Sequence, residues 1–304
     1  VPQGAAGYRW PAAGEAAEAA AGYTVVVTKS TVPVGTGDKV QQIVRRMRPD
    51  LRMDVVSNPE FLREGSAIED FKRPDRVVIG AESDPAREMM RLLYRPLFLN
   101  ETPIVFTDRR TAELTKYAAN ALLATKIAFI NEIADICERT GANVQGVARG
   151  IGLDKRIGSK FLHAGPGFGG SCFPKDTLAL ARTAAEVGKP SHIVDAVVRS
   201  NTERKAGMAG RIIDACGGSV AGKRIAILGV SFKPNTDDMR DSPSIGIVDA
   251  LGKAGASLIA YDPVASPAAR KLDGFGKVDW AANSYEAITG ADAPVLAPER
   301  DGVP

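Results

Sequence analysis

Short runs of β-branched residues recur along the first third of the chain and predict buried strands. TVVVT at residues 24–28 is the first of these runs, and similar runs follow at 54–57, 76–80 and 103–107. A short, continuously apolar run is typical of a strand that is covered on both faces of its sheet. The segments 36–48 and 84–94 between these runs have helical character. Strands that alternate with helices predict a mostly parallel α/β sheet.

The first 22 residues differ from this pattern. They are rich in alanine and glycine and show no clear hydrophobic period. A segment without a period gives no helix or strand signal. We therefore expect residues 1–22 to be irregular.

A long helix is predicted in the middle of the chain. No glycine or proline occurs between Thr111 and Thr140, apolar residues recur there at helical spacing, and Gly141 then provides a stop signal. A helix of about 29 residues is roughly 43 Å long. Such a helix suits a spine between domains or a dimer interface.

The remainder of the chain predicts a helical part followed by a second α/β part. Residues 142–210 look mainly helical, and the apolar run at 223–230 begins a new strand. A helix at 243–254 and a strand at 257–263 follow it. The predicted domains are therefore 1–110, 111–210 and 211–304.

The composition excludes several classes of function. The chain has 304 residues, 39 of them basic and 36 acidic, with a net charge of +3. This balance gives no sign of a nucleic-acid partner, and no apolar run approaches the roughly 18–20 residues that a membrane span needs. Three widely spaced cysteines and two histidines predict a reducing compartment, the cytoplasm, and argue against a disulfide scaffold or a metal site.

The glycines of GPGFGGSCFPKD at 165–176 formally satisfy the pattern G-x-G-x-x-G. A dinucleotide-binding loop needs a strand before these glycines and a helix opening from the last of them. SKFLHA precedes them, without a β-branched run. We therefore interpret the glycines as room for close approach of a ligand to the backbone.

Cys172 lies just after these glycines and is the strongest candidate nucleophile. Pro174 suits the first turn of a helix over 175–187, which places Cys172 ahead of a helix N-terminus with Lys175 nearby. A helix N-terminus and a cation both stabilise a thiolate. The alternative is a buried structural cysteine, which is the interpretation that we favour for Cys137 and Cys216.

Other polar candidates each have an ordinary alternative. Ser30 and Thr31 follow a predicted strand, where an α/β sheet binds its ligand, but a turn with a helix cap fits equally well. Pro59 can begin a helical turn that places Glu60 and Glu64 on one face, although such residues often only complement a helix dipole. On the long helix a polar stripe, either a site or a solvated face, comprises Glu113, Lys116, Asn120 and Asn131. SFKPNTDDMRDSP at 231–243 holds Lys233 and Arg240 and is either a binding loop or a charged surface loop.

Together, these stretches resemble the UDP-glucose 6-dehydrogenase family, within the UDP-glucose/GDP-mannose dehydrogenases. The resemblance rests on five motifs in the expected order: KSTVPVGT, SNPEFLREGSAI, ELTKYAANALLATKIAFINEI, GFGGSCFPKD and LGVSFKPNTDDMRDSPS. It implies oxidation of UDP-glucose to a carboxylate with two NAD. It also implies an α/β fold with an N-terminal Rossmann-like domain, a long central helix in a helical middle domain, and a C-terminal Rossmann-like domain that binds the UDP-sugar.

The resemblance also implies roles for individual residues. Cys172 matches the thiol that traps the aldehyde as a thiohemiacetal, which is then oxidised to a thioester. Asp176 and Lys116 match residues that manage protons or water, supported by Thr31, Glu60 and Asn120. Positions on the NAD side are Ser30, Glu64 and Arg240. Positions on the sugar-nucleotide side are Phe61, Leu62, Lys116, Asn120, Arg156, Phe161, Phe168, Gly169, Phe232 and Lys233. Arg156 matches an arginine that reaches the substrate of a neighbouring subunit, which implies a homodimer or a higher homo-oligomer.

The sequence departs from the family at both ends. Nothing before Thr24 resembles the Rossmann strand and glycine-rich loop that bind NAD, so we expect this first βαβ unit to be missing. ADAPVLAPERDGVP at 291–304 places prolines where an apolar strand is expected, so we also expect the last domain to be incomplete. Two alternatives stay open: a dehydrogenase for GDP-mannose or another sugar nucleotide, and an inactive fragment that binds the sugar nucleotide or dimerises.

Overall fold

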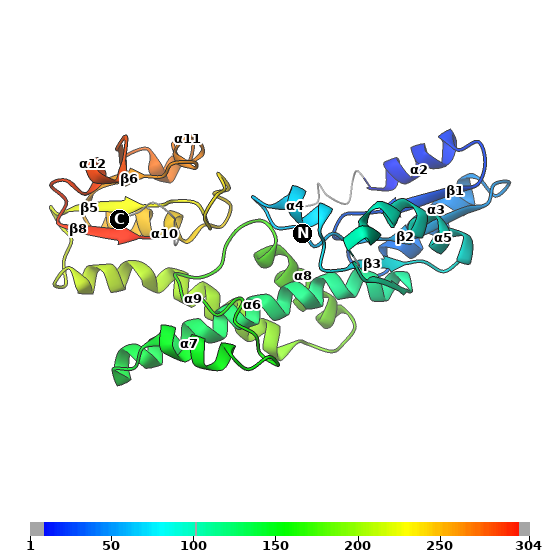
Figure 1. Cartoon of the computed structure of the whole chain (residues 1–304). Helices are drawn as coiled ribbons and strands as arrows, with labels where there is room; N and C mark the ends of the chain where they lie inside the picture. The colour runs from blue at the N-terminus through cyan, green and yellow to red at the C-terminus, as the bar shows by residue number, and fades with distance from the viewer. Residues whose placement is uncertain (1–8, 101, 298–304) are drawn as a thin grey trace. The chain divides into compact units, whose positions relative to one another are not determined.

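The computed structural model describes residues 9–100 and 102–297 (Figure 1). Contacts divide the chain into two compact units. The first unit, called unit 1, comprises residues 1–119 with 182–188, and the second, called unit 2, comprises residues 120–181 with 189–304. The long helix α6 (Arg109–Thr140) begins in unit 1 and ends in unit 2.

Unit 1 contains a four-stranded sheet with helices on both faces. Its elements are α2 (Arg9–Ala19), β1 (Thr24–Thr28), α3 (Thr36–Met47), β2 (Met53–Ser57), α4 (Ala67–Lys72), β3 (Val77–Gly80), α5 (Asp84–Tyr94), the 3-10 helix η1 (Arg95–Asn100) and β4 (Ile104–Thr107). The strand order is β1-β2-β3-β4. β1 pairs with β2 and β3 pairs with β4 in parallel, whereas β2 and β3 are antiparallel. The predicted strands and the mostly parallel sheet are confirmed.

The alternation of side chains along β2 explains the layers of unit 1. Val55 packs with α2 and α3, whereas Val56 packs with α5. Successive residues of a strand point to opposite faces of the sheet. Helices therefore cover both faces, which is why these strands are continuously apolar in sequence.

The prediction of an irregular segment at residues 1–22 is wrong for residues 9–19, and its first eight residues lie outside the described part of the chain. Residues Arg9–Ala19 form helix α2, in which Ala13 and Ala17 are buried against Val40 and Val44 of α3. Alanine has the highest helix propensity. Because alanine forms both the buried face and much of the exposed face, the helix shows no hydrophobic period in sequence.

Unit 2 combines a helical part with a second sheet. Besides most of α6, its elements are α7 (Val144–Gly152), α8 (Phe173–Glu186, up to residue 181), α9 (His192–Ala215), β5 (Arg224–Leu228), α10 (Pro243–Lys253), β6 (Ser257–Tyr261), α11 (Ser266–Ala269), the 3-10 helix η2 (Asp273–Phe275), β7 (Asp279–Trp280), α12 (Ser284–Ile288) and β8 (Ala293–Leu296). The sheet is parallel with the order β7-β6-β5-β8. Ile225 and Ile227 pack with α9 and α10 on one face, and Ala226 and Leu228 pack with α12 on the other.

The prolines near the C-terminus do not prevent the last described strand. Pro294 lies within β8 and pairs in register with Ala226 of β5. β8 is at the edge of the sheet in the described residues. Proline is tolerated in an edge strand because its missing N–H can face away from the neighbouring strand.

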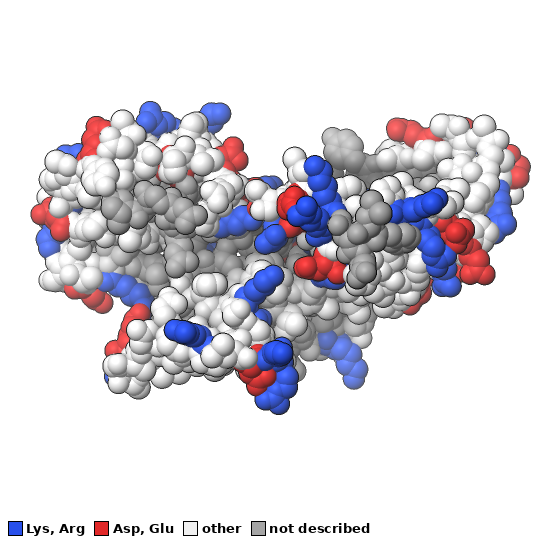
Figure 2. All heavy atoms as spheres, viewed as in Figure 1, with Lys and Arg blue, Asp and Glu red and all other residues white. Residues whose placement is uncertain are grey.

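The surface carries both signs of charge. On the face that Figure 2 shows, lysine and arginine side chains alternate with aspartate and glutamate. Among the described residues, no helix is long and apolar enough to cross a membrane.

Candidate active site

The predicted site residues are divided between the two units. Unit 1 holds those from Ser30 to Lys116, and unit 2 holds those from Asn120 to Arg240. Each group is described within its own unit.

In unit 1, Ser30 and Thr31 follow β1 at the edge where parallel strands present their carboxyl ends. The turn between them and α3 is held by Glu113 of α6. Its carboxylate accepts hydrogen bonds from the backbone N–H groups of Gly35 at 2.6 Å and Gly37 at 2.8 Å. The hydroxyl of Ser57 donates a third hydrogen bond, at 2.9 Å. An anion at a helix N-terminus is stabilised by the helix dipole, so Glu113 fixes the start of α3.

Glu113 is a buried carboxylate with competing influences on its ionisation. Burial raises the pKa of Glu113 above its usual value, although the hydrogen bonds from Gly37, Ser57 and Gly35 favour the charged form. The nearby Asp38 adds to the rise. The polar stripe predicted on α6 is therefore buried at this position, not a solvated face.

Replacing Glu113 with glutamine is expected to destabilise the fold by about 1–3 kcal/mol, the cost of an unsatisfied buried polar group. The glutamine amide turns an N–H₂ group toward one of the two backbone donors. The folded pKa of Glu113 lies above 4.5, so ionisation costs the wild type stability as the pH rises through that folded pKa. The difference in the free energy of unfolding between the wild type and Glu113→Gln is therefore expected to become smaller as the pH rises. Urea unfolding at several pH values measures it, with Glu132→Gln on the exposed face of α6 as the control. A difference in the free energy of unfolding that does not change with pH would contradict the prediction.

Lys116 lies one turn after Glu113 on α6 and is only 3% exposed. Its Nζ is 3.3 Å from Oε1 of Glu60 and 5.2 Å from the centre of the Phe61 ring. A buried ammonium group needs a carboxylate partner and gains further from an aromatic face. Unit 1 thus brings together three of the predicted site residues, namely Glu60, Phe61 and Lys116.

The predicted helical turn at Pro59 is absent. Residues 58–63 are irregular, and Glu60 instead accepts the N–H of Leu62 through Oε2 at 2.6 Å. This bond and the ion pair with Lys116 together use both carboxylate oxygens. The contact with Lys116 of α6 determines the position of Glu60. The four-residue spacing between Glu60 and Glu64 therefore does not reflect a helical turn.

In unit 2, Cys172 is exposed and immediately precedes α8. Its carbonyl accepts the N–H of Asp176 at 2.8 Å, the first hydrogen bond of the helix. The predicted helix start is confirmed, although α8 begins at Phe173 and Pro174 is its second residue. Cys137 is buried and Cys216, at the end of α9, is half-buried. Cys172 is therefore the accessible thiol of the three, next to the positive end of a helix.

Asp176 lies in the first turn of α8 and is 1% exposed. Its Oδ2 accepts a 2.6 Å hydrogen bond from the side-chain amide of Asn120. Its Oδ1 is 3.2 Å from Nζ of Lys175, but no group in the described residues bonds it with hydrogen-bond geometry. A buried carboxylate oxygen without a hydrogen bond requires an explanation. A water or a substrate hydroxyl that reached this oxygen would satisfy it.

The glycines before Cys172 are required by close packing. A Cβ on Gly169 would lie 2.4 Å from the carbonyl oxygen of Asp241, and one on Gly170 would lie 2.6 Å from the ring of Phe232. Gly170 also has a φ of 79°, and its N–H donates to the carbonyl of Arg240 at 2.8 Å. Only glycine fits both the space and this left-handed backbone.

The other predicted residues of unit 2 lie on irregular segments. Phe161, with a φ of 66°, and Phe168 each place their ring about 6 Å from the ring of Phe173, which follows Cys172. The ammonium group of Lys233 lies 5.3 Å from the ring centre of Phe232. Arg240 and Arg156 are largely exposed and pair with Asp238 and Asp154.

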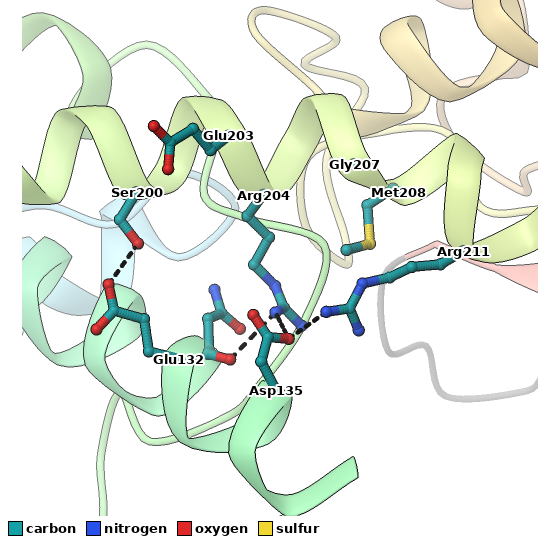
Figure 3. A pocket seen from close by; sticks show the side chains of 9 residues that line it. Glu132, Asp135, Ser200, Glu203, Arg204, Gly207, Met208 and Arg211 are labelled. Carbon is teal, nitrogen blue, oxygen red and sulfur yellow. Dashed lines mark hydrogen bonds and ion pairs between the residues drawn. The ribbon is translucent and has the colours of Figure 1, made fainter. Parts of the chain in front are cut away.

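A pocket of about 260 Å³ lies between α6 and α9 (Figure 3). Its lining residues are Asn131, Glu132, Asp135, Ser200, Glu203, Arg204, Gly207, Met208 and Arg211. Asn131, the last residue of the polar stripe predicted on α6, lines it, and the other predicted site residues do not. Arg204 and Arg211 both pair there with Asp135. These ion pairs could not be predicted from the sequence, because their partners lie on two different helices and meet only in the fold.

Three family models match the chain. Residues 7–98 match the NAD binding domain of the UDP-glucose/GDP-mannose dehydrogenase family, residues 110–203 its central domain, and residues 226–303 its UDP binding domain. The first match includes helix α2, in the segment that the sequence pattern predicted to be irregular.

Similar proteins of known name support the same relationship. A UDP-glucose 6-dehydrogenase of Rhizobium meliloti is 60% identical over 96% of this chain, which spans 67% of that protein. The UDP-glucose 6-dehydrogenase TuaD of Bacillus subtilis is 48% identical over 90% of this chain, which spans 59% of it. A UDP-glucose dehydrogenase structure from Pyrobaculum islandicum matches with a TM-score of 0.89 and 38% identity, covering 96% of this chain and 68% of that one.

Proposed function

We propose, because this chain belongs to the UDP-glucose/GDP-mannose dehydrogenase family, that it oxidises UDP-glucose to UDP-glucuronate in two NAD-dependent steps. The observation that carries the proposal is the pairing of an exposed thiol and a buried carboxylate at one helix start. Cys172 directly precedes α8, and Asp176 lies in the first turn of that helix. A single site that oxidises an alcohol twice must hold the aldehyde between the two steps, which a thiolate does covalently.

Some side chains of unit 1 suit NAD, and others do not. Ser30 follows β1 and Glu64 follows β2 in the chain, and hydroxyl and carboxylate groups suit the hydroxyls of a ribose. The start of α3 does not suit a pyrophosphate, because the carboxylate of Glu113 already accepts its N–H groups. We propose Ser30 and Glu64 of unit 1, and Arg240 of unit 2, as residues that bind the cofactor. When bound, the nicotinamide supplies the acceptor for each hydride.

The roles of the side chains follow from their chemistry. The Cys172 thiol adds across the aldehyde: its sulfur forms a C–S bond with the carbonyl carbon, and the proton that it gives up goes to the carbonyl oxygen, which becomes a hydroxyl. Loss of a hydride from this carbon and a proton from the hydroxyl leaves a thioester. A water, positioned by Asp176, adds to the thioester carbon. The C–S bond then breaks, which releases the acid and restores the thiol.

The remaining predicted residues support this chemistry. Lys116, paired with Glu60, stabilises negative charge on the reacting oxygen, and Asn120 orients Asp176 through its amide. We also propose a supporting role for Thr31, which follows β1. The residues proposed to bind the sugar nucleotide are Phe61, Leu62, Lys116, Asn120, Arg156, Phe161, Phe168, Gly169, Phe232 and Lys233.

NADH production from UDP-glucose tests the proposal. We would assay this chain and the chain extended to the length of its relatives, with GDP-mannose as a second substrate. The expected result is UDP-glucuronate, with two NADH formed for each sugar. Oxidation of GDP-mannose alone would exclude UDP-glucose as the substrate. Binding of UDP-glucose without turnover in either form would favour a sugar-nucleotide-binding or dimerising protein.

We also propose that the chain forms a homodimer through α6. Leu122, Phe129 and Ile136 are apolar and 64%, 50% and 55% exposed. They are seven residues apart, so they lie along one side of the helix. A seven-residue apolar repeat is the pattern of a seam between two helices, and a second copy of α6 provides the matching stripe.

The free cysteines further suggest a reducing compartment, the cytoplasm.

Phe129→Glu is expected to separate the proposed dimer into monomers. The change places a carboxylate at the centre of the stripe, where association would bury it without a partner. Sedimentation velocity measures the result as a fall from the mass of two chains to that of one. The control is Arg139→Glu, an exposed charge change in the last turn of α6. A wild type that sediments as one chain would refute the dimer.

A further inference from the structure

The segment between α7 and α8 carries Cys172 and has no regular structure. Residues 153–172 contain neither a helix nor a strand. The backbone groups of such a segment must find partners outside a regular ladder. Two of its residues, Gly165 and Phe168, find them in side chains of the helices α6 and α9.

Gly165 is held from both sides. Its N–H donates to Oδ1 of Asn131 at 2.8 Å, and its carbonyl accepts from Nε of Arg204 at 2.6 Å. Asn131 is 2% exposed and the Arg204 side chain 10% exposed. Arg204 also donates to the carbonyl of Asn131 and to the carboxylate of Asp135, beside the pocket between α6 and α9 (Figure 3). The guanidinium group therefore ties the loop to the long helix.

Phe168 is held by one amide. Asn201 of α9 accepts the N–H of Phe168 at 2.8 Å and donates to its carbonyl at 3.0 Å. Asn201 is 6% exposed and lies three residues before Arg204, so the two side chains share a face of α9. A buried amide with both its donor and its acceptor engaged is a rigid anchor.

The two anchors limit the position of Cys172. Only Gly169, Gly170 and Ser171 separate it from Phe168, and Gly170 is fixed by its bond to Arg240. After Cys172, the ring of Phe173 packs edge-on against the ring of Phe168. The thiol therefore lies on a short segment that is held at both ends.

We propose that Asn201, with Asn131 and Arg204, forms a set of positioning residues that hold the backbone of 165–168 and thereby place Cys172. The proposal rests on the proposed function for its catalytic meaning. These three residues act through the loop and do not touch the reacting atoms. Their side chains bind the loop backbone and so fix the position of the thiol. The reaction rate depends strongly on this position, since a misplacement of about 1 Å can lower the rate roughly 10²-fold.

The test is Asn201→Ala, compared with Ser200→Ala. Ser200 is the adjacent residue and also bonds across to α6, but its hydroxyl donates to Glu132 and not to the loop backbone. For Asn201→Ala we expect kcat to fall by roughly 10²-fold, with a much smaller change in KM. Ser200→Ala is expected to match the wild type. Asn201→Asp keeps the acceptor for Phe168 N–H and is expected to recover part of the loss.

Hydrogen exchange gives a second measurement that needs no turnover. The N–H of Gly170 bonds to Arg240 and not to Asn201. If Asn201 positions the whole loop, Asn201→Ala speeds exchange at Gly170 as well as at Phe168. Faster exchange at Phe168 alone, with kcat unchanged, would overturn the proposal.

The two measurements also separate the two proposals. A wild type without turnover refutes the proposed function, and exchange at Gly170 then still decides whether the loop is held by Asn201. If Asn201→Ala does not fold, Asn201→Asp and Arg204→Lys provide the same comparison. Arg204→Lys keeps a cation for Asp135 but loses the planar fork that reaches several acceptors at once. Unchanged turnover and exchange in both variants would also overturn the proposal.

Discussion

Cys172→Ser is expected to abolish the formation of UDP-glucuronate. The serine hydroxyl fits the same space, but it is not ionised at neutral pH and does not trap the aldehyde. We expect the rate of acid formation to fall on the order of 10³-fold or more, the scale on which enzymes lose rate when their nucleophile is removed. Product analysis by mass spectrometry, together with NADH formation, measures the effect.

The matched control is Cys216→Ser. Cys216 is a second free cysteine at the end of α9 that packs against the core of the C-terminal sheet. Its replacement should leave acid formation unchanged. A Cys172→Ser protein that still forms the acid at the wild-type rate would remove Cys172 from the mechanism, even if the fold and the substrate were as proposed.

Asp176→Asn has the second largest expected effect. The change removes the buried charge and puts an N–H₂ group near the amide of Asn120, where the carboxylate now accepts. We expect turnover to fall by about 10²–10⁴-fold, the range typical of a lost general acid or base. If Asp176 activates the water, a covalent adduct on Cys172 should accumulate when substrate and cofactor are present.

Intact-protein mass spectrometry detects this adduct. Its control is Asp195→Asn, in the first turn of α9, for which no accumulated adduct is expected. Full turnover by Asp176→Asn would contradict the role of this carboxylate. Loss of turnover without the adduct would instead place Asp176 in an earlier step.

The sheets could be predicted because each strand is marked by a few consecutive β-branched residues. The two middle strands, β2 and β3, are buried on both faces, and each is visible in the sequence as a short run of β-branched residues. The edge strands β1 and β4 show the same runs, although Val27 and Val105 are exposed. Helix α2 could not be predicted in the same way. Its buried face consists of alanines, and only its contact with α3 distinguishes that face from the rest.

The candidate site was visible where the sequence marks a helix start. Pro174 and the glycines before Cys172 identify the beginning of α8, which places the thiol. Asn201 gave no such signal. It is a polar residue inside a helix, and its partner Phe168 is 33 residues away in sequence. The contact between them depends on the packing of α9 against the loop, and this packing cannot be predicted from a short stretch of sequence.

The carboxylate of Glu113 at the start of α3 has a consequence for laboratory work. The chain supplies its own counter-ion there, covalently attached and buried, so dissolved anions do not compete for those N–H groups. Phosphate or sulfate in a buffer therefore leaves this turn unaffected. If either ion inhibits the protein, the inhibition reports on another place, and a sugar nucleotide that displaces the ion would identify that place as its own diphosphate site.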